Sequence, residues 1–218
     1  MGQTAVRFMH GLHHADIYAG FVPTFALDLQ GWNSQDPSFE RIIAEIRPIV
    51  VIDVGVWKGG STIHLANLLR KYEIDGVVLA VDTFLGSSEH WPGAPFSNLI
   101  GRRHGISMLY EQFLANVVRS GAQDLIVPMP QSSEGAAAIL AARGVRADLI
   151  HIDAAHDYES VRRDARDYWG LLAPGGYLVG DDYVTGWPGV VKAADEFSAE
   201  KNTPLVVSGP KWIMRKDA

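Results

Sequence analysis

Three aspartates stand at the ends of two apolar runs in the second half of the chain. Asp153 closes the run 147–153, and Asp181 and Asp182 close the run that begins at Tyr177. If these runs are neighbouring strands, about 4.8 Å apart, the carboxylates meet at one edge of a sheet. Clustered carboxylates raise each other's pKa, and a hard divalent cation removes that conflict. Because oxygen ligands favour magnesium, calcium or manganese over zinc, we predict a site for one of these hard cations there.

A histidine lies within reach of the same cluster. His156 follows Asp153 by three residues, and an ordinary imidazole pKa of about 6.5 suits proton abstraction near neutral pH. We predict that His156 is a general base, with Asp153 itself as the alternative. The less specific explanations are that Asp181 and Asp182 cap the next helix and that His156 is a surface side chain.

A glycine-rich segment and a further aspartate have the spacing of a nucleoside site. Gly55, Gly59 and Ser61 follow the apolar run 49–53, and Asp82 closes the next run along the chain. Glycines allow a tight turn and a close approach to a ligand, and the helix that follows offers free N–H groups. A carboxylate at the end of the second strand can accept both hydroxyls of a ribose. We therefore predict a nucleoside-containing ligand at this place.

The same glycines match other nucleotide-binding classes poorly. In a phosphate-binding loop a lysine precedes the Ser or Thr, but here Gly60 precedes Ser61 and Lys58 is displaced by two residues. A short-chain dehydrogenase would have a lysine four residues after Tyr158, where this chain has Arg162.

Hydrophobic periodicity predicts the strands and helices that position these residues. Short β-branched runs alternate with helical spacing from residue 36 onward, which predicts an α/β fold with a mainly parallel sheet and helices on both faces. A turn at Gly209-Pro210 predicts a C-terminal hairpin, so that one strand of a seven-stranded sheet is antiparallel. The predicted strands are 49–53, 77–82, 125–127, 147–153, 177–181, 205–208 and 212–215, and the predicted helices begin near Asp36 and cover 61–72, 108–120, 134–142, 158–172 and 190–200.

Two segments fall outside this alternation. We expect residues 1–35 to be an irregular N-terminal extension with solvated histidines. Residues 36–218 form the main domain, and within it the aperiodic insertion 83–105 is typical of a lid or substrate loop. The candidate substrate-binding side chains, which lie just past strand ends, are His90, Trp91 and Trp187.

The composition excludes several classes of protein. The net charge is −6, whereas a nucleic-acid binder usually has a basic face, so we do not expect a nucleic-acid partner. No apolar run approaches the ~20 residues of a membrane span, and the N-terminus has no signal-peptide pattern. The absence of cysteine removes thiolate metal ligands and a cysteine nucleophile. We expect a cytoplasmic protein with a small-molecule partner, and a homo-oligomer is compatible with these features.

Four motifs, taken in order, resemble the class I S-adenosylmethionine-dependent methyltransferases. The similar branch is the metal-dependent group of macrocin-type, rhamnosyl and novobiocin-sugar O-methyltransferases. The resemblance implies a Rossmann-like methyltransferase fold and Mg²⁺-dependent transfer of a methyl group to a hydroxyl of a small molecule, such as a deoxysugar or another diol. The motifs are Asp53-Val-Gly55-x-x-x-Gly59-x-Ser61, Val81-Asp82-Thr83-Phe84, Ile152-Asp153-x-x-His156-x-Tyr158, and Pro174-Gly175-Gly176 before Asp181-Asp182-Tyr183.

The resemblance also implies that residues 1–35 contribute to the acceptor pocket or to an oligomer contact, and it implies roles for individual residues. The third small residue usual in the glycine loop is replaced by Trp57, which is a departure from the family pattern. A protein of the same fold that binds S-adenosylmethionine or a nucleotide, with other or no transferase chemistry, is the alternative. The implied metal ligands are Asp153, Asp181 and Asp182. The implied cofactor residues are Asp53, for the amino group; Gly55, Gly59 and Ser61, for methionine and ribose; Asp82, for the ribose hydroxyls; and Ser132, for the adenine.

Overall fold

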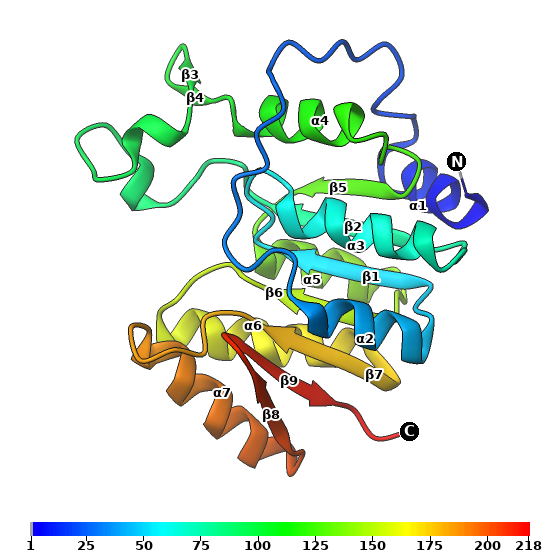
Figure 1. The fold of residues 1–218 in the computed structure, drawn as a ribbon, viewed down its shortest axis with the longest axis vertical. Coiled ribbons are helices and arrows are strands. Elements are labelled where there is room, and N and C mark those ends of the chain that lie inside the picture. Colours follow the sequence, from blue (N-terminus) through cyan, green and yellow to red (C-terminus); the bar gives the residue numbers. More distant parts are fainter. Residues whose placement is uncertain (1) are drawn as a thin grey trace.

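One sheet forms the centre of the computed structural model, which describes residues 2–218. Its strand order is β5-β2-β1-β6-β7-β9-β8, and β9 alone runs antiparallel to its neighbours (Figure 1). The predicted seven-stranded, mainly parallel sheet with a closing hairpin is therefore confirmed. The strands are β1 (Val50–Val54), β2 (Val77–Asp82), β5 (Ile126–Pro130), β6 (Ala147–Ile152), β7 (Leu172–Gly180), β8 (Leu205–Ser208) and β9 (Lys211–Arg215).

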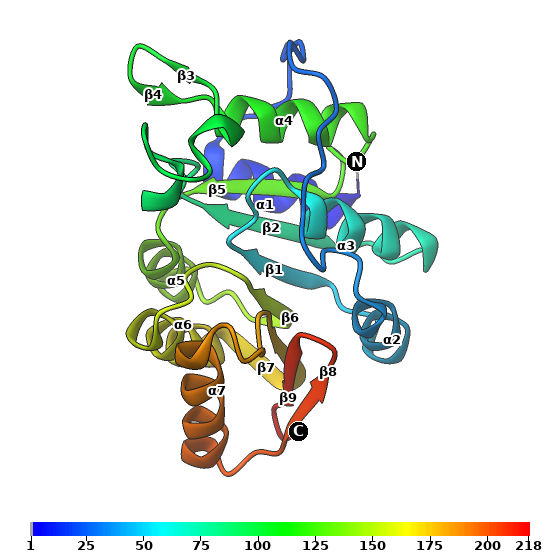
Figure 2. The same ribbon diagram turned by 60° about the vertical axis from the view of Figure 1, so that its left-hand side comes forward.

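Helices cover both faces of this sheet, as predicted. Figure 2 shows α2 and α3 on one side of the strands and α5, α6 and α7 on the other. The side chain of Asp36 accepts a hydrogen bond from the backbone N–H of Ser38, so α2 begins where the sequence indicated. The helices around the sheet are α2 (Pro37–Ile46), α3 (Gly60–Lys71), α4 (Leu109–Arg119), α5 (Ser133–Ala142), α6 (Tyr158–Leu171) and α7 (Pro188–Lys201).

The expectation of an irregular N-terminus is wrong for its first part. A helix, α1 (Gln3–His13), buries Ala5 and Met9 one turn apart. The ring of His13 is hydrogen-bonded to the carbonyl of Pro128 in β5, at 2.8 Å. The histidines His10 and His13 therefore lie on a packed helix rather than in a solvated loop. The apolar stripe of α1 is short, which is why periodicity alone did not indicate it.

The insertion between β2 and α4 has little regular structure, as expected. It contains two short 3₁₀ turns, Ser88–His90 and Ser97–Leu99, and the start of a small hairpin, β3 (Arg102–Arg103) with β4 (Ile106–Ser107). Figure 1 shows this segment extending away from the sheet beside α4. We refer to residues 83–105 as the lid.

Candidate functional site

The strand order reverses between β1 and β6. From β1 the chain runs through β2 to β5 on one side, and it returns to β6 and β7 on the other. In open α/β sheets, ligands bind beyond the carboxyl ends of the strands at such a point. The loops after β1 and β6 are in contact there, because a Cβ on Gly55 would lie 2.0 Å from the carbonyl oxygen of Asp153. With a φ of +83° as well, this position requires glycine.

Asp53 lies inside the sheet, where it connects α3 to β6. Its buried carboxylate accepts hydrogen bonds from Ser61 Oγ at 2.8 Å, Thr62 Oγ1 at 2.6 Å and His151 Nδ1 at 2.7 Å. Burial alone would raise the pKa of Asp53, but these hydrogen bonds outweigh burial and hold the pKa below its ordinary value. Asp53 therefore fixes the start of α3, and its contact with a cofactor stays a prediction.

Asp82 stands at the carboxyl end of β2, next to the glycine loop. Its carboxylate accepts backbone hydrogen bonds from Trp57 at 2.9 Å and from Phe84 at 2.7 Å. Burial raises the pKa of Asp82 above its ordinary value. Trp57 has a left-handed backbone with a φ of +51°, and its buried indole Nε1 has no hydrogen-bond partner within residues 2–218. Trp57 therefore donates its backbone N–H to Asp82 and keeps its indole N–H without a partner in the described part of the chain.

The turn after β5 lies beside the end of β2. The backbone N–H of Gln131 donates to the carbonyl of Asp82 at 2.9 Å. Ser132 is exposed, and its Oγ accepts from the N–H of Gly135 as the N-cap of α5. The predicted contact of Ser132 with adenine stays a prediction.

The ends of β6 and β7 bring carboxylates and imidazoles together. The two strands are parallel neighbours. We call Asp153, His156 and Asp182 the outer group, and His151, Asp153 and Asp181 the inner group. Within each group the possible ligand atoms lie within 4.8 Å of one another. Asp153 belongs to both groups, whereas Asp181 and Asp182 belong to different ones, so the predicted aspartate triad is divided between two neighbouring positions.

His156 lies between the two carboxylates of the outer group. Its Nε2 is 2.8 Å from Asp182 Oδ2 and 3.9 Å from Asp153 Oδ1, and its ring stacks on Trp187 at 4.3 Å. Asp153 and Asp182 raise the pKa of His156 to about 10. The ring is then an imidazolium, which cannot accept a proton. His156 can therefore act as a base only if a metal ion binds the carboxylates of Asp153 and Asp182, so that they no longer raise its pKa.

A lysine that the sequence analysis missed lies against the inner group. Lys211 is fully buried, and its Nζ lies 2.6 Å from Asp181 Oδ2 and 3.1 Å from His151 Nε2. The other oxygen of Asp181 accepts from the backbone N–H of Asp182 at 2.8 Å. The available signals were weak: His151 interrupts an apolar run, and Lys211 directly precedes the predicted final strand.

The three candidate substrate-binding residues lie in different surroundings. Trp187 stacks on His156 of the outer group, and the ring of His90 lies 4.5 Å from that of Trp57 in the glycine loop. Trp91 instead packs under the guanidinium of Arg102, within the lid itself. Two of the three therefore contact the candidate site.

Residues 20–34, which we call the strap, are held against the glycine loop. The buried Lys58 donates to Asp28 Oδ2 at 2.6 Å and to Gln30 Oε1 at 3.0 Å. Asn116 of α4 exchanges hydrogen bonds with the backbone of Asp28 and donates to the carbonyl of Lys58. These contacts connect the strap, the glycine loop and α4.

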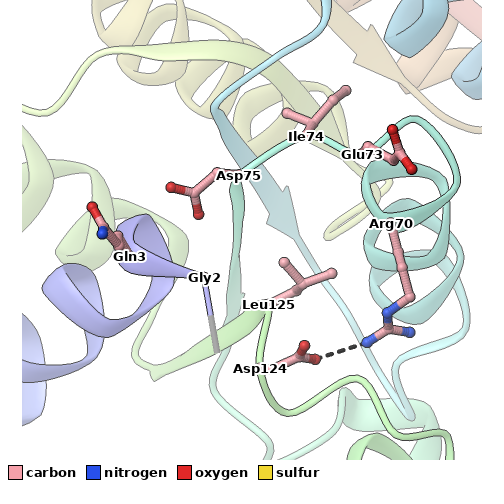
Figure 3. Close-up of a pocket in the computed structure, with 8 residues that line it drawn as sticks. All are labelled: Gly2, Gln3, Arg70, Glu73, Ile74, Asp75, Asp124 and Leu125. Atoms are coloured by element: carbon pink, nitrogen blue, oxygen red, sulfur yellow. Dashed lines mark hydrogen bonds and ion pairs between the residues drawn. The ribbon is translucent and has the colours of Figure 1, made fainter.

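A hollow of about 500 Å³ lies at the opposite edge of the sheet. Figure 3 shows it between the start of α1 and the segments that lead into β2 and β5, with Arg70 paired to Asp124. It is therefore separate from the ligand-binding edge that the strand order indicates.

Comparison with known families identifies the chain. Residues 52–183 match the family described as "Methyltransferase domain". The chain belongs to this family. No curated protein sequence matches the methyltransferase. None of its helices within residues 2–218 is long and apolar enough to cross a membrane.

Solved structures have the same fold as this methyltransferase. The O-methyltransferase NovP aligns with a TM-score of 0.66 at 17% identity, over 98% of this chain and 97% of NovP. TomG from Streptomyces achromogenes, an O-methyltransferase of tomaymycin synthesis solved with S-adenosylmethionine, aligns with a TM-score of 0.62 at 13% identity, over 100% and 91%. CalS11, a TDP-rhamnose 3′-O-methyltransferase of calicheamicin biosynthesis, aligns with a TM-score of 0.56 at 20% identity, over 98% and 93%. The predicted Rossmann-like methyltransferase fold is confirmed.

Proposed function

We propose that this methyltransferase moves the methyl group of S-adenosylmethionine to a hydroxyl oxygen of a small diol, such as a deoxysugar, with the help of Mg²⁺ or Mn²⁺. The observation that carries the proposal is the outer group, Asp153, His156 and Asp182, which lies at the strand-order reversal next to the glycine loop. The names of the structural neighbours support it, since NovP and TomG are O-methyltransferases and CalS11 acts on a TDP-sugar.

The residues around the glycine loop fit S-adenosylmethionine. The indole N–H of Trp57 has no partner within residues 2–218, and it would need only a small movement of the ring to donate to a polar group of a ligand. Asp82, at the end of β2, suits ribose hydroxyls, and Ser132 lies beside it for the adenine. Gly55, Gly59 and Ser61 would line the methionine and ribose side.

The residues beyond β6 and β7 fit a divalent cation. The carboxylates of Asp153 and Asp182, whose oxygens lie within 4.8 Å of each other and of the imidazole of His156, suit magnesium or manganese, which prefer oxygen ligands. Asp153 and Asp182 would hold the ion, with His156 beside them and Asp181 as the remaining member of the predicted triad. When bound, the ion lowers the pKa of the acceptor hydroxyl.

The chain's own side chains must then hold the acceptor and remove one proton. S-adenosylmethionine, when bound, would supply the methyl group and keep the electron pair of the broken carbon–sulfur bond, and the side chains would hold the acceptor oxygen in line with that carbon. His156 Nε2 would receive the hydroxyl proton, with Asp153 as the alternative acceptor of that proton. Trp187 and His90 would contact the acceptor from either side of the site, and the strap and lid would close over it. This gives residues 1–35 their proposed part in the acceptor pocket.

A transfer assay tests this function. The protein is incubated with methyl-labelled S-adenosylmethionine and a panel of vicinal diols, both deoxysugars and catechol-like rings, with Mg²⁺ or with excess chelator. We expect label in at least one diol with Mg²⁺ and none with chelator. Equal transfer in chelator would contradict the metal requirement. Binding of S-adenosylmethionine without transfer to any acceptor would favour the alternative, a cofactor-binding protein without this activity.

A further inference from the structure

The ammonium group of Lys211 is buried against two members of the inner group, His151 and Asp181. Lys211 has no exposed surface, and Asp181, its ion-pair partner, is 5% exposed. The ring of Phe39 lies over the ammonium, with its centroid 5.0 Å from Nζ. A buried charge is retained only when it is paired and hydrogen-bonded, and here both partners belong to the group that could hold a metal ion.

The antiparallel strand explains how a lysine reaches this edge. The start of β9 lies beside the end of β7, with Trp212 opposite Gly180. A Cβ on Gly180 would lie 1.9 Å from the indole of Trp212, so only glycine allows β9 this close. Lys211 is thereby placed directly against Asp181, at the carboxyl edge of the parallel strands.

The hydrogen bonds of Lys211 have only one consistent direction. An ammonium can only donate, so His151 Nε2 accepts from it and the hydrogen of the imidazole lies on Nδ1, where it is donated to Asp53. On the other side Lys211 donates to Asp181, which in turn accepts from the backbone N–H of Asp182. Asp182 has a left-handed φ of +61°, and its carboxylate faces His156 in the outer group. Lys211 therefore positions His151 and Asp181 of the inner group. Through Asp181 it also positions the backbone of Asp182, whose carboxylate belongs to the outer group.

The two groups have Asp153 in common, as the two positions of a two-metal site with a bridging carboxylate would. We propose that Lys211 is a positioning residue that serves as the permanent cation of the inner group, so that the protein binds a single divalent ion, at the outer group. This inference rests on the proposed metal-dependent function.

Titration of the full-length protein with Mn²⁺ tests the inference. Calorimetry and the electron paramagnetic resonance of free Mn²⁺ both give the number of ions bound per chain. We expect one ion for the natural protein, two for Lys211→Met, and one for Lys211→Arg, which keeps the charge. Lys216→Met is the matched control, because Lys216 also lies near the end of the chain but donates to the carbonyls of Trp169 and Leu172, and it should bind one ion.

Thermal unfolding gives a second measurement that does not depend on activity. Lys211→Met should melt at a lower temperature than the natural protein without metal, and Mn²⁺ should raise its Tm by more than it raises that of the natural protein. If Lys211→Met is insoluble, Lys211→Gln removes the charge and keeps a donor to Asp181.

The outcomes separate this inference from the proposed function. Two ions in the natural protein, or one ion and an unchanged Tm response in Lys211→Met, would overturn the role of Lys211. No ion in the natural protein with one in Lys211→Met would support the inner-group role while removing the metal-dependent function.

Discussion

The edge of the sheet at β1, β6 and β7 and the lid are built in different ways. At the edge, polar side chains are buried and hydrogen-bonded to one another, as in the series Asp53, His151, Lys211 and Asp181. In the lid, Trp91 is 58% exposed and packs on Arg102, and the ring of His90 packs against that of Trp57. A network in which each donor has one acceptor holds atoms in fixed positions, whereas a lid with few buried contacts can change shape. We therefore propose that the chemistry takes place at the edge and that the lid contributes to the acceptor pocket.

The largest effect is expected at the outer group. His156→Ala should lower kcat by ~10²–10⁴-fold, the usual contribution of a general base, with the affinity for S-adenosylmethionine unchanged. Steady-state kinetics and a Mn²⁺ titration of the same variant separate a base from a ligand. His64→Ala, a half-buried histidine on α3, is the control and should keep its rate. A fall in kcat of only a few-fold would indicate that Asp153 is the base. Weakened Mn²⁺ binding would indicate that His156 is a metal ligand instead.

A smaller effect is expected on the cofactor side of the edge. Asp82→Ala should weaken binding of S-adenosylmethionine by about 1–3 kcal/mol, because ribose hydroxyls and backbone N–H groups lose their acceptor. Calorimetry measures the change, and Asp75→Ala at the opposite edge serves as the control. An unchanged affinity in Asp82→Ala would exclude this residue from the cofactor site.

Two of the exposed tryptophans, Trp187 and Trp91, allow a direct comparison of the edge with the lid. Trp187 stacks on His156, whereas Trp91 packs on Arg102 within the lid. Trp187→Ala should therefore raise the KM for the acceptor more than Trp91→Ala does, and neither should change the KM for the cofactor. A larger effect of Trp91→Ala would mean that the lid, rather than the edge, provides the main acceptor contact.

The smallest effect is a pH dependence of stability in metal-free buffer. The pKa of His156 is about 10 in the folded chain, above its ordinary value of 6.5. Its stabilising contribution is therefore complete below pH 6.5 and is lost as the pH rises toward 10. In chelator, the Tm difference between the natural protein and His156→Gln should shrink across that interval. A difference that does not vary with pH would mean that the ring is not held as an imidazolium.

The sequence carried most of the fold and the outline of the site. Alternating periods predicted the sheet, because buried parallel strands read as short apolar runs and the helices between them as amphipathic stretches. The aspartates Asp82, Asp153 and Asp182 could be placed because each lies at or just after the carboxyl end of a strand, and the ends of parallel strands share one edge.

The inner group could not be predicted in the same way. Lys211 and His151 are 60 residues apart in sequence and meet only because β9 is antiparallel and next to β7. Neighbouring aspartates also face different groups, since the left-handed backbone of Asp182 turns its carboxylate away from that of Asp181. Local sequence patterns predict neither the order of the strands in the sheet nor the left-handed backbone of one residue.

One titration tests the central claim, that cofactor and ion have separate sites on the two sides of the strand-order reversal. S-adenosylmethionine is titrated into the protein by calorimetry, once with Mg²⁺ and once with excess chelator, and methyl transfer to the best diol is measured in the same two buffers. We expect one cofactor bound per chain with the same Kd in both buffers, and transfer only with Mg²⁺. Loss of cofactor binding in chelator would show that the two sites are not separate, and full transfer without the ion would show that the ion is not needed.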